Sequence, residues 1–357
     1  MHKSHYQADN TTQINSINMA SDKKSCSIFR CSGTKSQSTQ KTTPKFNAKS
    51  TAREVVESLQ ANLTGKVILI TGATSGIGVE TARALALTKA HIIITARNME
   101  KGADVVNDIK TTTNNNNVEV MELNQNSLKS VRDFANEYIK RKLPLHILIC
   151  NAGIMATPYQ KTIDGYESQF AVNHLSHFLL TILLLPVLKA SKPSKVIVVS
   201  SCANRQGGIN WNDINWEQNY DKWKAYAQSK TSNILFAKQL SKLYSNDGIK
   251  AYSLHPGGIM TGLQKDLTRE EMNQMGFFDK NGNLIEAFKN VEQGAATTVW
   301  AALSNELDDK SGEYLEDCNI SVGVTNEQGY FGLSPHSVDM EQAQRLWDIS
   351  LEMTELK

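Results

Sequence analysis

Short apolar runs alternate with longer amphipathic segments from about residue 63 to the end of the chain. The apolar runs consist mainly of β-branched and aliphatic residues and cover residues 66–71, 91–95, 118–122, 145–150, 195–200 and 249–254. Strands that are apolar at successive positions are buried on both faces, as in parallel sheets. The segments between and after them have the length of helices and cover residues 76–89, 99–110, 127–141, 165–190, 223–245, 291–303 and 337–353. This alternation predicts an α/β fold in which right-handed βαβ units form a doubly wound parallel sheet.

Residues 1–62 do not continue the pattern. They are rich in Ser, Thr, Asn, Gln and Lys and show no periodicity, which is the composition of a disordered tail. Cations outnumber acids in the tail, so it is basic. A basic, Ser-rich leader can be an organelle transit peptide, but no Arg-rich amphipathic helix is evident, which favours a plain extension on a cytoplasmic protein. We therefore expect a disordered tail over 1–62 and a single folded domain over 63–357.

The composition is that of a soluble globular protein, with 40% hydrophobic and 21% charged residues, enough to build a core. The formal net charge of +2 gives no indication of nucleic-acid binding, and no nucleic-acid partner is expected. No apolar run is long enough to span a bilayer, so no transmembrane segment is expected. The cysteines are scattered without the spacing of a metal site, at positions 26, 31, 150, 202 and 318. They indicate a reducing compartment, no disulfide framework and no bound metal.

The first apolar run leads into a glycine-rich turn, Thr-Gly-Ala-Thr-Ser-Gly-Ile-Gly, that starts at Thr71 and opens a helix. Gly72 permits a tight turn, Gly76 lets the backbone approach a pyrophosphate, and Gly78 allows close packing of the helix. The N-terminus of the helix offers free N–H groups and a positive dipole to phosphates. A strand before and a helix after the turn predict a Rossmann-type dinucleotide site, formed by Gly72, Thr74, Ser75, Gly76, Ile77 and Gly78. The alternative is a tight turn that binds nothing.

The end of the second apolar run favours one dinucleotide over the other. An acidic residue there would bind the ribose 2′-hydroxyl of NAD, whereas an arginine suits the 2′-phosphate of NADP. The sequence has Arg97 and no acid at this position, with Lys101 one helical turn further on. Because guanidinium pairs well with phosphate, NADP(H) is favoured and NAD(H) remains possible. The alternative is that Arg97 is an ordinary surface charge beside a helix start.

Tyr226 and Lys230 are spaced four residues apart in the segment 223–245, which places both side chains on one face of the predicted helix. A neighbouring ammonium favours phenolate and is expected to lower the pKa of Tyr226 from about 10. Such a phenol could exchange a proton with an alcohol or a carbonyl. The same spacing also occurs on solvated helices that have no catalytic function.

Taken together, the motifs resemble the short-chain dehydrogenase/reductase family over about residues 63–353. In chain order they are Thr71-Gly-x-x-x-Gly-x-Gly, Asn151-Ala-Gly, Val172-Asn-His-Leu, Val199-Ser-Ser, Tyr226-x-x-x-Lys230 and His255-Pro-Gly. The local sequence around Val172 and after Ser229 also resembles that of the retinol dehydrogenase-like branch, which includes the WW-domain-containing oxidoreductases. No WW-like module is recognisable before the domain. The resemblance implies an oxidoreductase that interconverts an alcohol and a carbonyl with NAD(P)(H).

The resemblance also implies four catalytic residues. Tyr226 matches the general acid/base, and Lys230 matches the residue that binds the nicotinamide ribose and lowers the pKa of the tyrosine. Ser201 matches the serine that hydrogen-bonds the substrate oxygen. Asn173 matches the asparagine that supports a water-mediated proton path. His174, His177 and His255 are expected to pack in the core or to support the groups around the site and not to be ligands, because no further ligand set accompanies them.

Further cofactor residues follow from the same resemblance. The turn Asn151, Ala152 and Gly153 would border the cofactor, and Pro256, Gly257 and Thr261 would lie beside the nicotinamide. The family usually has Asp near the adenine where this sequence has Asn124, which keeps a donor and an acceptor for adenine. Family members often dimerise through the helices expected at 165–190 and 223–245, so a homodimer is possible.

Two segments after predicted strands are candidates for the substrate pocket. Residues 203–222 contain Trp211, Trp216 and Tyr220, and residues 262–290 contain Leu263, Leu267, Met272, Met275, Phe277, Phe278 and Leu284. Apolar loops at this edge predict a lid over a small hydrophobic carbonyl or alcohol, and the resemblance implies a retinoid, a steroid or a lipid aldehyde. The alternatives are that these residues only pack the loops, or that the protein is a catalytically silent dinucleotide sensor or scaffold.

Overall fold

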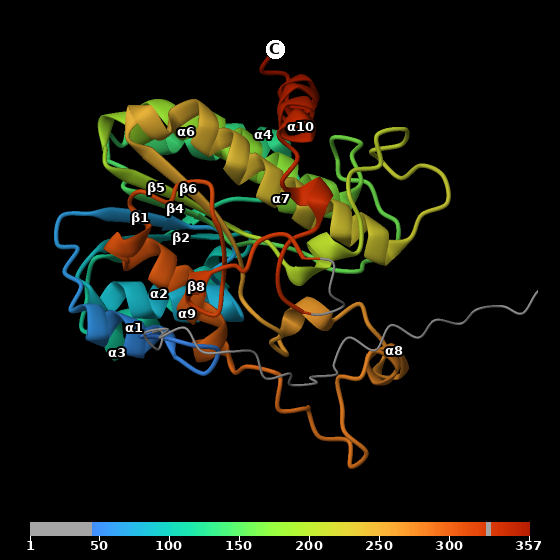
Figure 1. Cartoon of the computed structure of the whole chain (residues 1–357). Helices are drawn as coiled ribbons and strands as arrows, with labels where there is room; N and C mark the ends of the chain where they lie inside the picture. Colours follow the sequence, from blue (N-terminus) through green and yellow to red (C-terminus); the bar gives the residue numbers. More distant parts are fainter. Residues whose placement is uncertain (1–44, 326–329) are drawn as a thin grey trace, which may run out of the picture.

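The computed structural model describes residues 45–325 and 330–357 (Figure 1). This part of the chain forms one sheet with the strand order β3-β2-β1-β4-β5-β6-β7-β8. All neighbouring strands are parallel except β7 and β8, which are antiparallel. The strands are β1 (Val67–Ile70), β2 (His91–Ala96), β3 (Val118–Glu122), β4 (Ile147–Cys150), β5 (Ser194–Val199), β6 (Ile249–His255), β7 (Tyr314–Glu316) and β8 (Asn319–Ile320). The predicted doubly wound α/β sheet is confirmed, and its order reverses between β1 and β4.

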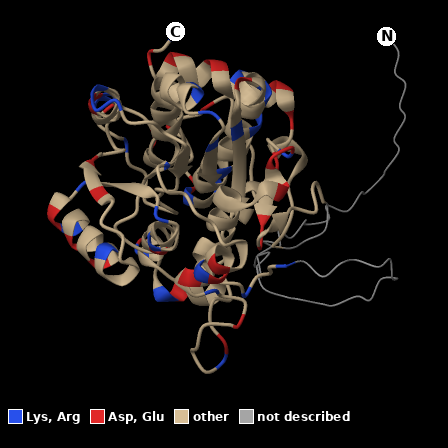
Figure 2. Cartoon of the chain, turned by 90° about the vertical axis from the view of Figure 1, so that its left-hand side faces the viewer, with Lys and Arg blue, Asp and Glu red and all other residues tan. Residues whose placement is uncertain are grey.

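Helices cover both faces of the sheet (Figure 1). One layer comprises α1 (Ala52–Leu59), α2 (Ile77–Leu87), α3 (Met99–Thr113) and α9 (Val291–Leu303). The other comprises α4 (Leu128–Lys140), α6 (Ser176–Ala190) and α7 (Lys222–Tyr244), with α10 (Met340–Met353) packed on α7. The short helix α8 (Arg269–Gln274) lies in a long excursion between β6 and α9. Basic and acidic residues are interspersed along the elements visible in Figure 2.

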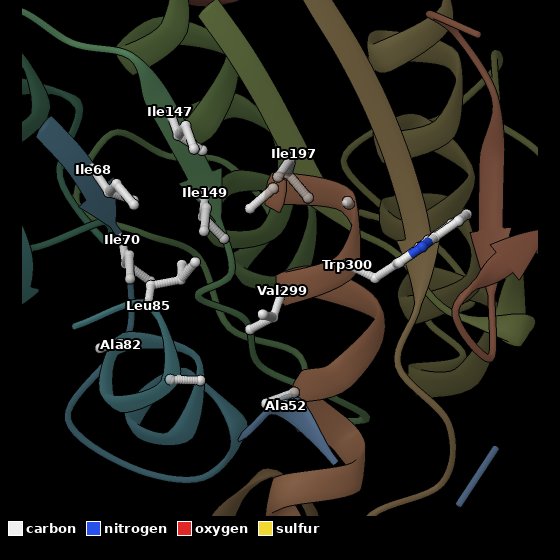
Figure 3. Close-up of a cluster of buried hydrophobic side chains, with 14 of the residues drawn as sticks. Ala52, Ile68, Ile70, Ala82, Leu85, Ile147, Ile149, Ile197, Val299 and Trp300 are labelled. Atoms are coloured by element: carbon white, nitrogen blue, oxygen red, sulfur yellow. The ribbon is translucent and has the colours of Figure 1, made fainter. Parts of the chain in front are cut away.

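The two faces of β1 show how the apolar runs build the core. Ile68 and Ile70 belong to a cluster with residues of α1, α2 and α9 (Figure 3). Leu69 points the other way, into a cluster with residues of α4, α6 and α7. Side chains alternate between the faces of a strand, so a strand covered by helices on both sides must be apolar at every position. All residues of β1 are accordingly buried.

The predicted domain boundary at residue 63 is corrected by α1. Thr51 caps this helix in a capping box, and Val55 and Val56 are buried on its inner face. Phe46, before the helix, is also buried in the core. Folded structure therefore begins ahead of residue 63, because a short helix in a polar segment needs few apolar residues to dock on α9. The predicted disorder of residues 1–44 lies outside the described residues.

The helical run Ser168–Ala190 is, within the described ranges, the one stretch long and apolar enough to cross a membrane. However, 78% of its apolar window is buried inside the protein, as expected of a core helix. The run consists of α5 (Ser168–Phe170), a π-helical turn (Ala171–Leu175) and α6. Periodicity predicted one continuous helix here and did not predict the π turn.

Candidate active site

A pocket of about 710 Å³ opens along the carboxyl ends of the strands, the edge at which open α/β sheets bind ligands. Each of the first six strands contributes the segment that follows it to the wall. These segments include the glycine turn after β1, Arg97 after β2, Leu123 after β3, Asn151, Ala152 and Gly153 after β4, Ser200 to Ala203 after β5, and Pro256 and Gly257 after β6. His255, the last residue of β6, also lines the pocket. Thr261, predicted beside the nicotinamide, also lies on the wall.

The glycine turn needs its glycines for steric reasons. Gly72 has φ +64°, and a Cβ at this position would lie 2.6 Å from the Cα of Ala152. A Cβ on Gly78 would lie 2.4 Å from the carbonyl oxygen of Gly72. The Asn151 amide donates to the carbonyl oxygens of Thr71 and Gly72 at 2.8 and 3.0 Å. The turns after β1 and β4 are therefore in direct contact and form one surface.

The start of α2 is suited to an anion. Its N-cap, Gly76, has φ +59°, and no side chain of the described residues caps the helix. The first N–H groups of a helix have no partner within the helix, so those of α2 can bind a phosphate with the help of the helix dipole. Thr74, Ser75 and Ile77, which the sequence predicts as cofactor-binding residues, line the pocket beside Gly76.

The far end of the pocket agrees only in part with the prediction. Arg97 is exposed on the pocket wall directly after β2. Among the described residues that line the pocket, Asn124 is not present. Instead its side-chain oxygen accepts a hydrogen bond from the backbone N–H of Asn126 at 3.1 Å. The side chain closes its own turn, and Gln125 and Asn126 line the pocket in its place, so the predicted adenine contact of Asn124 is not supported.

Tyr226 and Lys230 lie on the first half of α7, and both side chains line the pocket although they are almost fully buried. The Lys230 ammonium lies 5.6 Å from the centroid of the Tyr226 ring. It also donates a hydrogen bond to the carbonyl oxygen of Val199, at the end of β5, at 3.1 Å. Ser201, two residues beyond Val199, lies close enough to Tyr226 for its side chain to lower the pKa of the phenol. Thus α7 and the end of β5 bring the three side chains together.

Asn173 lies behind this wall, in the π-helical turn, and is fully buried. Its side-chain oxygen accepts from the N–H of Ile154, and its amide donates to the Ile154 carbonyl and to the Ser229 hydroxyl, each at 2.9 Å. Gly153 separates it from the pocket, since a Cβ on Gly153 would be 3.2 Å from the Asn173 Oδ1 and 3.5 Å from the Lys230 Nζ. The asparagine therefore positions the turn after β4.

Burial dominates the electrostatics of the catalytic pair. Burial raises the pKa of Tyr226, although the Ser201 side chain acts in the opposite direction. Burial also lowers the pKa of Lys230 to about 8. The predicted lowering of the Tyr226 pKa is therefore wrong for the protein groups alone, because desolvation of the phenolate outweighs the effect of the Ser201 side chain.

Only one of the two candidate substrate segments brings its large apolar side chains to the pocket. In residues 262–290, Leu263, Met275, Phe277 and Phe288 reach the pocket wall. In residues 203–222, by contrast, Trp211 packs beside α10 under the Arg345 guanidinium. Trp216 and Tyr220 donate to the Gln228 side chain and the Thr157 carbonyl, so these three rings only hold the loop.

Met155, Trp223 and Tyr330 are among the pocket residues that the sequence did not predict. Trp223 precedes Tyr226 by nearly one helical turn, so its spacing from Tyr226 could have predicted its place on the pocket wall. Tyr330 comes from a distant C-terminal loop, and nothing in its sequence context points to the pocket. No group of His, Cys, Asp and Glu able to hold a metal is found within the described residues.

Comparisons with known proteins agree with this geometry. The family model for short chain dehydrogenases matches residues 66–272. The short-chain dehydrogenase/reductase prx1 of Penicillium roqueforti is 40% identical over 302 residues, which covers 83% of this chain and 86% of that protein. Retinol dehydrogenase 12 of Homo sapiens is 38% identical over 292 residues, which covers 82% of this chain and 87% of that protein.

Solved structures show the same fold. An uncharacterised protein from Mycobacterium paratuberculosis is 32% identical with a TM-score of 0.63, and the match covers 83% of this chain and 95% of that chain. A short chain dehydrogenase from Burkholderia cenocepacia, in complex with NADP, is 21% identical with a TM-score of 0.57, and the match covers 72% of this chain and 98% of that chain. The chain therefore belongs to the short-chain dehydrogenase family and is an NAD(P)-dependent oxidoreductase that acts on CH–OH groups.

Proposed function

We propose that the protein uses NADP(H) to interconvert an alcohol and a carbonyl on a small apolar substrate, with Tyr226 as the general acid/base. The observation that carries this proposal is that Ser201, Tyr226 and Lys230 line the same pocket as the glycine turn. A site that holds a dinucleotide and an acid/base in one cavity can pair redox chemistry with proton transfer.

The pocket suits a dinucleotide at the end where β1, β2 and β3 finish. The uncapped start of α2 and the positive-φ glycines provide a cradle for the pyrophosphate. Arg97 is accessible at the end of β2, where a guanidinium would pair with a 2′-phosphate. When bound, the nicotinamide would exchange hydride with the substrate carbon.

The side chains of this protein supply the proton chemistry. The Ser201 hydroxyl would hold the substrate oxygen, and Tyr226 would give that oxygen a proton in reduction or remove it in oxidation. The positive charge of an oxidised nicotinamide would add to that of Lys230 and favour phenolate, opposing the effect of burial on the pKa of Tyr226. Asn173 would keep the turn around Gly153 in place behind the reacting groups.

The substrate class follows from the rest of the wall. The phenol ring of Tyr226 packs in an apolar cluster that includes Met155, Trp223 and Phe277, all of which line the pocket. A pocket of this kind favours uncharged, lipophilic molecules such as retinoids, steroids or lipid aldehydes. Relatives that are 38–39% identical are named for retinol, a lipophilic alcohol. A catalytically silent sensor is not favoured, because the acid/base and its lysine are both present on the wall.

The Tyr226→Phe substitution tests the proposal. NADPH consumption with a panel of hydrophobic aldehydes and ketones should fall at least about 10²-fold, the contribution typical of general acid–base catalysis, while NADPH binding persists. Tyr244→Phe, at the other end of α7, is the matched control and should keep full turnover. Undiminished turnover by Tyr226→Phe would rule out its role as the acid/base.

A further inference from the structure

His177 lies in the first turn of α6, directly after the π turn, and is 1% exposed. Its Nδ1 atom is 3.0 Å from the carbonyl oxygen of Asn173. Its Nε2 atom is 2.8 Å from the Thr71 hydroxyl and 2.8 Å from the Gln125 amide nitrogen. The imidazole therefore touches the turn that carries Asn173 on one side and two cofactor-binding segments on the other.

These contacts determine which ring nitrogen carries the proton. A carbonyl oxygen can only accept, so Nδ1 must be the donor to Asn173. In a neutral imidazole Nε2 is then an acceptor, and it receives hydrogen bonds from the Thr71 hydroxyl and the Gln125 amide. A proton on Nε2 would instead face the amino group of Gln125, which can only donate. Burial, together with the charge of Lys230, lowers the pKa of His177 to about 4, in accord with a neutral ring.

The bond to Nε2 also orients the hydroxyl of Thr71. With its proton directed at Nε2, the Thr71 oxygen is free to accept, and it does so from the backbone N–H groups of Asn151 and Ala152 at 3.0 and 3.1 Å. A continuous chain of hydrogen bonds thus runs from the imidazole to the turn that borders the cofactor. Gln125 lines the cofactor pocket itself.

The bond to Nδ1 serves the catalytic end. It holds the carbonyl of Asn173, whose side chain fixes Ile154 and Ser229. Ser229 is adjacent to Lys230 on α7, and Ile154 follows Gly153. The two sides of a single imidazole therefore support different parts of the enzyme.

We propose that His177 is a positioning residue with two separable functions: its Nε2 organises the cofactor-binding turns, and its Nδ1–H holds the π turn that supports the catalytic groups. This inference rests on the proposed function of the pocket. It assigns His177 no contact with the substrate or the cofactor.

Two substitutions separate the functions, because each amide imitates one ring nitrogen. His177→Asn places an amide nitrogen near the position of Nδ1, so the bond to Asn173 is kept and the acceptor for Thr71 is lost. His177→Gln reaches the position of Nε2 with its amide oxygen, so the acceptor is kept and the donor to Asn173 is lost. We expect the Asn variant to raise the Kd for NADPH about tenfold and to keep kcat within about twofold of wild type. The Gln variant should lower kcat about tenfold and keep the Kd for NADPH within about twofold of wild type.

His174→Asn and His174→Gln are the matched controls. His174 is equally buried in the same helical run, but its Nε2 bonds to Ser350 of α10, away from the pocket. These variants should lower the melting temperature, and neither should change Kd or kcat selectively. If both His177 variants change Kd and kcat together, or change neither, the proposal is overturned. A wild-type protein that binds no NADPH would instead refute the proposed function.

A measurement on the wild-type protein covers the case in which a His177 variant does not fold. In protein labelled with ¹⁵N-histidine, the ring of His177 should show a protonated Nδ1 and an unprotonated Nε2 through neutral pH. The opposite tautomer, or a protonated ring, would overturn the hydrogen-bond assignment on which the proposal rests.

Discussion

Replacing Gly72 by alanine tests the contact between the turns after β1 and β4. The new methyl group would lie 2.6 Å from the Cα and 2.7 Å from the Cβ of Ala152. Neither atom is at the end of a flexible side chain, so backbone must move. The turn is also fixed on its other side, since Asn151 bonds to the carbonyl oxygens of Thr71 and Gly72.

Two costs contribute to the expected loss of stability. The left-handed backbone at Gly72, φ +64°, costs a residue with a side chain about 1–2 kcal/mol. The overlap with Ala152 adds about 1–3 kcal/mol, the usual cost of overpacking. The free energy of unfolding should therefore fall by about 2–5 kcal/mol, the sum of these terms.

Gly65→Ala isolates the first cost. Gly65 has φ +79°, and a Cβ at this position would have no atom within 4 Å, so its substitution carries the backbone term alone. Urea unfolding of both variants, followed by circular dichroism without cofactor, measures the difference. Equal losses in the two variants would show that the steric contact with Ala152 contributes nothing, and would refute this account of the turn.

Three further predictions concern the cofactor, the lysine and the substrate. Arg97→Gln should weaken NADPH binding about tenfold or more while leaving NADH binding nearly unchanged, because a charge-assisted hydrogen bond is lost; equal effects on both cofactors in a titration would contradict a 2′-phosphate contact. Lys230→Met should stabilise the cofactor-free protein at neutral pH while abolishing turnover. Folding lowers the pKa of Lys230 to about 8, so above that pH the unfolded chain binds more protons than the folded protein. The cost of burying the charged ammonium, which the substitution removes, should therefore shrink as pH rises from 8 through the unfolded-state pKa near 10.4. A stability difference between variant and wild type that is independent of pH would contradict this. Phe277→Ala should raise the KM of apolar substrates several-fold without changing the Kd for NADPH, whereas Trp211→Phe should change neither.

The fold was predictable where burial leaves a continuous pattern. The strands β1, β2, β4 and β5 each contain an unbroken run of three or four apolar residues, so these strands could be predicted from the sequence. The strand β7 contains only Tyr314–Glu316, and its extended form depends on pairing with β6. The helix α1 was missed for a related reason, since its docking uses two valines within a polar segment. In both cases tertiary contact decides the structure, and local pattern does not.

The site was predictable where chemistry and spacing coincide. Tyr226 and Lys230 share a helix face, and the glycines are required by sterics that any sequence of this fold must meet. The position of Asn124 was not predictable, because a polar side chain in a turn can bond to its own backbone as readily as to a ligand. The direction of the Tyr226 pKa shift depends on how deeply the phenol is buried, which spacing alone does not reveal.

The π turn changes the direction in which side chains point from the part of the helical run before it to the part after it. Successive residues of an α-helix are rotated by about 100°, and the wider turn at Ala171–Leu175 inserts a shift in that sequence of directions. Asn173 can then face the turn after β4 while Phe178 and Leu184, further along, face the core. Deleting one residue from this turn would restore a uniform helix but force a choice between the two alignments. The catalytic register and the packing register of this run are thus set by a single local irregularity.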